Sequence, residues 1–225
     1  MKRFYKAVTV ADDTILLDGR PIRTPARHLL QIEFPQLAEA IAGEWRAQGE
    51  EIDPRAMPMT GLANAAIDRV APDPAAFAAP LLRYAETDLL CYRAEEADLA
   101  GEQAATWDPL LDWARGRYDV HFEVTRGIVH VAQPPATVAR LGEALMARDA
   151  FALAAMSPLV TIGGSLVTAL ALAEREIGAD AAFDATHLDE LWQARHWGED
   201  EQALAMRESR RADFTAAARF LDLAA

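Results

Sequence analysis

Six acidic residues that lie near aromatic residues in the sequence could provide the paired carboxylates of general acid–base catalysis. They are Asp88, Asp108, Asp112, Glu190, Glu199 and Asp200. Asp108 and Asp112 are four residues apart and would share a helix face, but surface helices commonly show this spacing. A catalytic site also requires pocket geometry, which spacing does not provide. A small acid–base enzyme that uses Glu190 or Asp88 is therefore one interpretation of the sequence.

The histidines, the cysteine and the glycines form no recognisable metal or nucleotide motif. The five histidines include no His-Glu-x-x-His arrangement, and Cys91 has no cysteine partner. Gly163-Gly164-Ser165 has neither the lysine of a phosphate-binding loop nor the glycine spacing of a dinucleotide-binding fold. We therefore expect no metal and no cofactor.

Tyr84, Asp88 and Tyr92 follow one another at intervals of four residues. If a helix continues through the segment 84–93, these side chains form a ridge of two aromatic rings and one carboxylate, and Asp88 is a candidate partner-binding residue. Alternatively, Leu89-Leu90-Cys91-Tyr92 forms a buried turn or a short strand. The sequence leaves both arrangements open.

The segment 188–200 places two tryptophans and several acids on a predicted helix. One face carries Leu188, Leu191, Trp192 and Arg195, and a second face carries Glu190, Gln193 and Trp197. A helix that needs only one core stripe would carry small charged residues on its second face. A tryptophan beside a carboxylate there indicates packing or recognition, although a helix buried on two sides of a bundle shows the same pattern.

Composition narrows the class of protein. The chain has 225 residues, 52% of them hydrophobic, which is enough to bury a core. Its formal net charge of −13 disfavours nucleic acid or an anionic membrane as a partner. The single cysteine, Cys91, fits a reducing compartment, and the first residues contain no apolar signal core, so we expect a cytoplasmic bacterial protein. The most apolar segment, 158–173, is too short to span a bilayer, so we expect no membrane insertion.

The first third of the chain has the pattern of a small antiparallel sheet. Strand-like runs occupy residues 4–10, 15–17, 22–24 and 29–34. Asp12-Asp13 and Asp18-Gly19 fall where tight turns are needed, and glycine readily adopts the positive φ of such turns. We therefore expect Asp18 and Gly19 to have a structural role.

Helical periodicity dominates the rest. Helices are predicted from Pro35 to Gly49 and over 59–70, and Pro72-Asp73-Pro74 is the best domain boundary because paired prolines break helices. Trp107 begins an apolar helical stripe, which predicts a structural role for it. A weaker strand pair is expected at 121–124 and 128–132. The predicted fold is α+β, with a sheet-containing domain over 1–73 and a helical domain over 74–225.

Motifs along the whole chain resemble the family of assembly chaperones for the catalytic head of F-type ATP synthase, the members that bind its alpha subunit. The motifs are Arg3-Phe4-Tyr5-Lys6, Asp18-Gly19-Arg20-Pro21, Glu44-Trp45-Arg46, Trp107-Asp108-Pro109-Leu110-Leu111 and Trp197-Gly198, with the segments 24–26, 52–54, 57–60, 62–64 and 84–93. Each motif is weak alone. Their number and order make the resemblance specific.

The resemblance implies an ATP-independent chaperone rather than an enzyme. Such a protein shields the alpha-subunit surface that later faces beta, an apolar interface that would otherwise aggregate. It implies action in the cytoplasm of bacteria, and in the mitochondrial matrix for eukaryotic relatives, with no small-molecule substrate. The two alternatives to a chaperone are the small acid–base enzyme and a protein-interaction scaffold without client preference.

The resemblance also assigns residues. The family's acidic and aromatic helix motif falls on Glu190, Gln193, Trp197 and Gly198, and its tryptophan in the first helix falls on Trp45. Arg195 stands where the family commonly has an acid, which leaves Glu190 as the firmest acidic contact. Glu199 is a further partner-binding candidate. We expect Trp45 to be structural and buried, beside Ile41.

Overall fold

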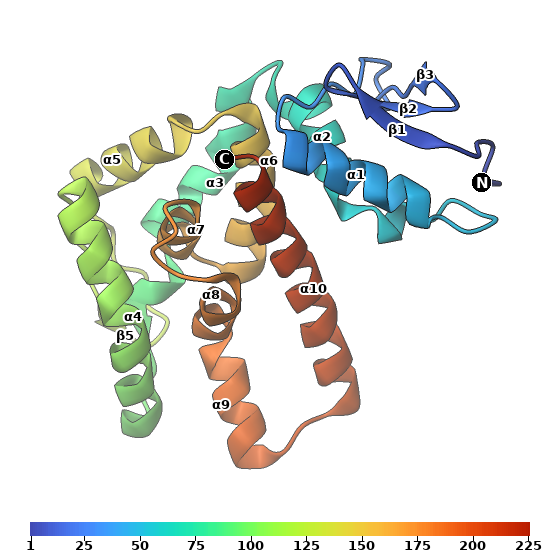
Figure 1. Ribbon diagram of the computed structural model, residues 1–225. Coiled ribbons are helices and arrows are strands. Elements are labelled where there is room, and N and C mark those ends of the chain that lie inside the picture. The colour runs from blue at the N-terminus through green and yellow to red at the C-terminus, as the bar shows by residue number, and fades with distance from the viewer.

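The computed structural model describes residues 1–225, and it has a small sheet and one helix beside a larger group of helices (Figure 1). The regular elements in chain order are β1 (Val8–Ala11), β2 (Thr14–Leu17), β3 (Arg20–Pro21), α1 (Pro35–Ala47), η1 (Pro54–Ala56), α2 (Pro58–Ala65), η2 (Ala66–Val70), α3 (Pro74–Glu86), η3 (Leu89–Cys91), β4 (Tyr92–Arg93), α4 (Ala97–Tyr118), β5 (Thr125–Arg126), α5 (Pro135–Met146), α6 (Ala150–Gly163), α7 (Leu166–Ala173), α8 (Ala179–Thr186), α9 (Leu188–Trp197) and α10 (Glu201–Leu223). The predicted α+β class is confirmed.

The N-terminal sheet is antiparallel, with strand order β1-β2-β3. Its β2–β3 turn is the predicted one, because Asp18 and Gly19 have positive φ angles of 49° and 76°. The Asp18 carboxylate accepts hydrogen bonds from the backbone N–H groups of Ala7 (2.8 Å) and Lys6 (3.1 Å). These bonds hold the pKa of Asp18 below its ordinary value. Asp18 thus fastens the start of the chain to the sheet.

Residues 22–34 do not form the two predicted strands. Only isolated bridges occur there, between Arg23 and Leu29 and between Thr14 and Gln31. Backbone bonds hold this segment at separate points, such as the Leu30 N–H to the Ile22 carbonyl (3.2 Å). Asp68, more than 40 residues away, adds to them by accepting hydrogen bonds from the hydroxyl of Thr24 (2.6 Å) and the backbone N–H of Ala26 (2.9 Å).

The predicted strand pair at 121–124 and 128–132 is also wrong. β5 pairs in parallel with β4 instead, through Tyr92 with Thr125 and Arg93 with Arg126. The two halves of the loop are joined by a side chain, because the Gln133 amide accepts from the Glu123 N–H (3.0 Å) and donates to the Glu123 carbonyl (2.9 Å). The Gln133 side chain thus makes the two hydrogen bonds to the Glu123 backbone that a paired strand residue would make.

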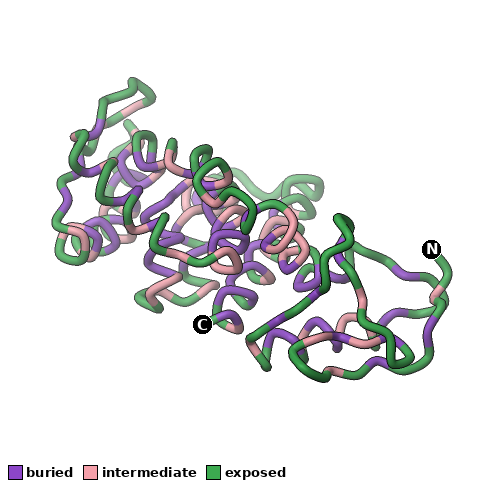
Figure 2. The backbone as a smooth tube through the Cα atoms, turned by 90° about the horizontal axis from the view of Figure 1, so that it is seen from above, coloured by how far each residue is buried: buried purple, intermediate pink, exposed green.

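The helical core is built around α6 and α7. Every residue of α7 from Leu166 to Leu172 is buried, and α6 packs against α10, α3, α2 and η2. Buried residues are concentrated in this helical part, whereas much of the N-terminal chain is exposed (Figure 2). α2 contacts both α1 and α10, so the two parts share one core, and a domain boundary between 73 and 74 stays a prediction. No helix combines the length and apolarity that crossing a bilayer requires.

Candidate partner-binding site

Helix α9 carries the predicted acidic and aromatic motif, and its two tryptophans have different environments. Trp192 is buried and stacks on the His196 ring at 3.9 Å between centroids. Trp197 meets the Trp192 ring edge to face at 5.5 Å and is 74% exposed. Gln193 is exposed as well. Trp192 therefore anchors the helix, and Trp197 presents an indole to solvent from a fixed support.

Glu190 faces α10 and is engaged in internal ion pairs. Its two carboxylate oxygens contact Arg207 at 3.4 Å and Arg210 at 2.6 Å. The Arg207 side chain is only 9% exposed and also pairs with Glu199. A buried guanidinium needs such partners, since an uncompensated buried charge is costly. Glu190 is thus a half-buried group that joins α9 to α10, whereas the sequence suggested an exposed contact.

A groove lies along the other side of α9, between this helix, α8 and α4. It has a volume of about 740 Å³ and an apolar lining from Ala181, Ala185, Leu188, Leu191 and Ala194. Glu102, Asp184 and Glu199 also line it, as does Arg195, which bonds to Glu102 at 2.5 Å. Each of the three carboxylates is more than 40% exposed. The groove is therefore apolar within, and the exposed carboxylates at its border are each paired with an arginine.

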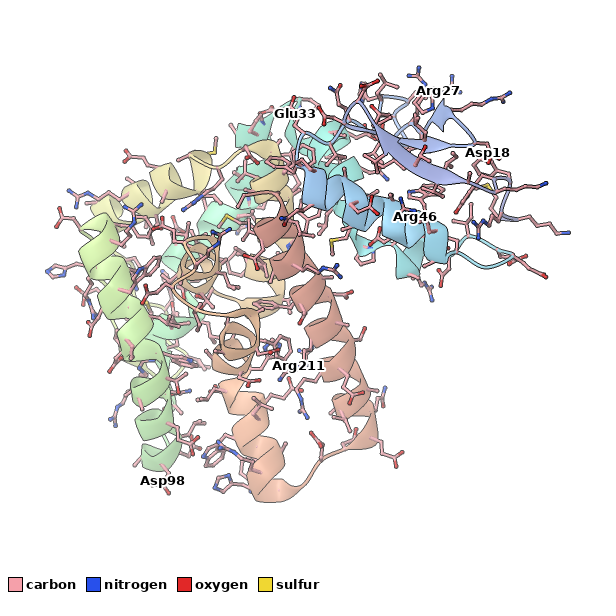
Figure 3. The ribbon with its side chains drawn as sticks, in the orientation of Figure 1. Asp18, Arg27, Glu33, Arg46, Asp98 and Arg211 are labelled. Atoms are coloured by element: carbon pink, nitrogen blue, oxygen red, sulfur yellow. The ribbon has the colours of Figure 1, made fainter.

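Arginines of α10 form ion pairs with the acids of α8, of α9 and of the segment after α9. Arg211 extends from α10 toward α8, where it bonds to Asp184 at 2.5 Å and lies 4.3 Å from the Phe183 ring centroid (Figure 3). Sequence reasoning missed these arginines. The signal was the spacing of Arg207, Arg210 and Arg211, which puts three cations on one helix face opposite the acids of 184–199.

Asp88 lies inside the protein, so its expected role as a partner contact is wrong. α3 ends at Glu86, and the aromatic ridge of Tyr84, Asp88 and Tyr92 does not form. The Asp88 carboxylate is fully buried and accepts hydrogen bonds from the N–H groups of Val167 (2.9 Å) and Leu90 (3.1 Å). It therefore caps the start of α7 and of η3. Burial raises its pKa to about 6 against these hydrogen bonds.

The two tryptophans expected to be structural differ in burial. Trp107 is fully buried, its Nε1 donates to the Ala185 carbonyl at 2.7 Å, and the Arg93 guanidinium lies 5.0 Å from its ring centroid. Trp45 is half-buried rather than enclosed beside Ile41. Tyr5 donates from its hydroxyl to the Trp45 carbonyl at 2.6 Å, and this links the chain start to α1.

No group of three histidine, cysteine, aspartate or glutamate side chains is placed to hold a metal ion. An apolar groove with charged walls and an exposed tryptophan is typical of a protein that binds other proteins. The comparisons with known proteins give the family. The ATP12 chaperone protein model matches residues 2–115, and the chain belongs to this family.

Two solved structures are similar to the whole molecule. Atp12 from Paracoccus denitrificans has a TM-score of 0.94 and 41% sequence identity, over 100% of this chain and 98% of that one. The Atu1473 protein from Agrobacterium tumefaciens has a TM-score of 0.93 and 42% identity, over 98% of this chain and 85% of that one. The family is one of chaperones for ATP synthase assembly, which implies an ATP synthase subunit as the partner.

The buried Asp88 gives stability a specific pH dependence. Its folded-state pKa of about 6 exceeds the ordinary value of 3.8, so the folded state binds the proton more tightly than the unfolded state. Its contribution to stability is complete below pH 3.8 and is lost as pH rises through about 6, a change of about 3 kcal/mol. In urea unfolding, the advantage of the wild type over Asp88→Asn is expected to grow as pH falls from 6 to 4. Parallel pH profiles would contradict this assignment.

Charge reversal at Glu190 is expected to weaken the fold. Glu190→Lys places a third cation beside Arg207 and Arg210 and should cost about 2 kcal/mol or more of unfolding free energy. Glu208→Lys, which changes an exposed acid without an ion pair on the same α10, is the matched control and should cost under about 0.5 kcal/mol. Chemical denaturation measures both, and equal midpoints for the two variants would show that Glu190 is not structural.

Proposed function

We propose that this protein is an ATP-independent assembly chaperone that binds the unassembled alpha subunit of ATP synthase. It covers the alpha-subunit surface that later faces beta and leaves when beta takes its place. The site of action is the bacterial cytoplasm. The observation that carries the proposal is helix α9, which borders the groove shared with α4 and α8 and also ends in the exposed Trp197.

The groove has the chemistry that a reversible client contact requires. Leucine and alanine side chains offer an apolar surface, and three carboxylates at its border are each more than 40% exposed, so they can also accept contacts from basic groups of a client. Each carboxylate already has an internal partner, so release does not leave an unpaired charge behind. This favours binding that is selective and still gives way to a competitor. The proposed contact residues are Gln193, Trp197 and Glu199. Glu190 helps to position them because it shares the partner Arg207 with Glu199.

The structure gives little support to an acid–base enzyme. Glu190 is committed to two arginines and Asp88 is enclosed by backbone donors, so neither carboxylate lines a pocket with a second titratable group free to exchange a proton. A scaffold without client preference differs from a chaperone in selectivity, because it would protect unrelated aggregating proteins as well as the alpha subunit.

The mechanism predicts which additions cause release. We expect the purified protein to keep isolated alpha subunit soluble without ATP, and to protect an unrelated aggregating protein far less. Adding beta should displace the chaperone because both cover one surface, whereas nucleotide alone should not. Light scattering and size-exclusion chromatography after each separate addition test this. Release by nucleotide without beta would refute competition, and equal protection of both clients would indicate a scaffold.

Trp197 should contribute strongly to binding and weakly to stability. Trp197→Ala is expected to weaken alpha-subunit binding about tenfold or more, since exposed tryptophans that become buried at an interface dominate its affinity. Its melting temperature should stay near that of the wild type because the indole is 74% exposed. Met206→Ala on α10, 58% exposed, is the matched control. Unchanged affinity for Trp197→Ala in a titration would remove this residue from the contact surface.

A further inference from the structure

The first 28 residues carry a charge opposite to that of the rest of the chain. They contain the basic side chains Lys2, Arg3, Lys6, Arg20, Arg23 and Arg27 against three acids, a net +3 within a chain of net −13. None of these six cations lies within 4.0 Å of a carboxylate, whereas 11 of the other 16 arginines do. The cations in this part of the molecule are therefore not held in ion pairs, although Glu50 and Glu51 line a pocket together with Lys2 and Arg3.

A groove of about 630 Å³ lies among these cations on the outer part of the N-terminal sheet. Its apolar lining includes Phe4, Pro21, Ile22 and Trp45, and Arg20 and Arg23 line it too. Asp18, labelled at this end of the sheet in Figure 3, is the one acid in the lining, and its carboxylate already accepts backbone hydrogen bonds. The groove therefore combines apolar surface with two arginines against one carboxylate, which leaves its lining with a net positive charge.

Three aromatic rings give the groove a firm wall. Phe4 meets Tyr5 edge to face at 5.4 Å between centroids, and Tyr5 meets Trp45 in the same way at 5.6 Å. The Tyr5 hydroxyl donates to the Trp45 carbonyl, which fixes this row of rings to α1. Phe4, at the free end of the row, is nonetheless 65% exposed. A large apolar side chain held at the surface in this way is typical of a contact residue.

We propose that this groove binds an acidic segment of a partner protein that also carries apolar side chains. The cations complement the acids of such a segment, and the aromatic wall accepts its apolar side chains. Pro21 in the edge strand β3 has no N–H to donate, so side chains rather than strand addition provide recognition. The net charge of −13 opposes an extended polyanion such as nucleic acid. A short segment experiences mainly the groove, since charges beyond about 10 Å are screened.

This surface is separate from the groove beside α9, and it is tested separately. The probe is a short fluorescein-labelled peptide in which Asp and Glu alternate with Leu and Phe. Its binding is measured by fluorescence anisotropy at two salt concentrations. We expect it to bind about tenfold more tightly than a version with Lys for the acids or a version with Ser for Leu and Phe. Arg20→Glu combined with Arg23→Glu should weaken binding about tenfold or more. Phe4→Ser should weaken it as well.

Matched variants separate this effect from total charge and from folding. Arg83→Glu with Arg126→Glu makes the same charge change at two exposed positions outside the N-terminal sheet and should leave peptide affinity within about twofold. Arg23 donates to the Arg27 carbonyl, so Arg20→Glu alone is the variant to use if the double variant does not fold. Trp197→Ala should bind the peptide normally, which keeps this result independent of alpha-subunit binding.

Two peptide results would overturn the proposal. They are equal binding of the acidic and basic peptides, and undiminished binding of the acidic peptide by a folded Arg20→Glu variant.

Two further measurements test other occupants. If a single-stranded DNA of the same charge binds as tightly as the acidic peptide, the groove is assigned to nucleic acid and the proposal is wrong. If sedimentation velocity shows a dimer that Arg20→Glu abolishes, the groove is assigned to a second copy of this chain and the proposal is also wrong.

Discussion

Burying α6 and α7 on every side is the constraint on which the rest of the structure depends. These helices are apolar around most of their circumference, so α2, α3, α10 and their neighbours must cover them from all directions. Their ends then lie where water cannot satisfy the backbone N–H groups. Ser165 caps α7 at the Thr168 N–H, and Asp88 takes the Val167 N–H from another part of the chain. A carboxylate is thus kept in the core because the helix start must have an acceptor.

The same logic explains how α9 is presented. Arg207 and its partners Glu190 and Glu199 connect α9 to α10, while Trp192 anchors α9 and leaves Trp197 outside. Polar groups buried between helices fix one relative position more strictly than apolar packing alone. The acidic and aromatic residues of α9 therefore differ in what they contact in this chain. Glu190 joins α9 to α10 through Arg207 and Arg210, whereas Gln193 and Trp197 are exposed.

Sequence was most informative where a signal is local. The Asp18-Gly19 turn, the proline starts of α1 and α3 and the stripe containing Trp107 all depend on residues close together in the chain. The sequence was misleading where a distant side chain takes part. Asp68 holds residues 24–26 in a segment that has only isolated bridges, and the Gln133 amide joins two halves of a loop where a strand pair was predicted. The burial of Asp88 and the ion pairs of Glu190 could not be predicted, because a carboxylate looks the same in a sequence whether it caps a helix, pairs with a buried arginine or faces solvent.

The packing of α10 sets the order in which the core can close. This helix lies against α2 and α6, and it inserts Phe214 and Phe220 into the shared core. During translation α10 leaves the ribosome after α2, α3, α6 and α7, so these earlier helices keep an uncovered apolar face until α10 has emerged. A chain without α10 would lack the surface that closes the core. The core can therefore close only after the whole of α10 has been synthesised.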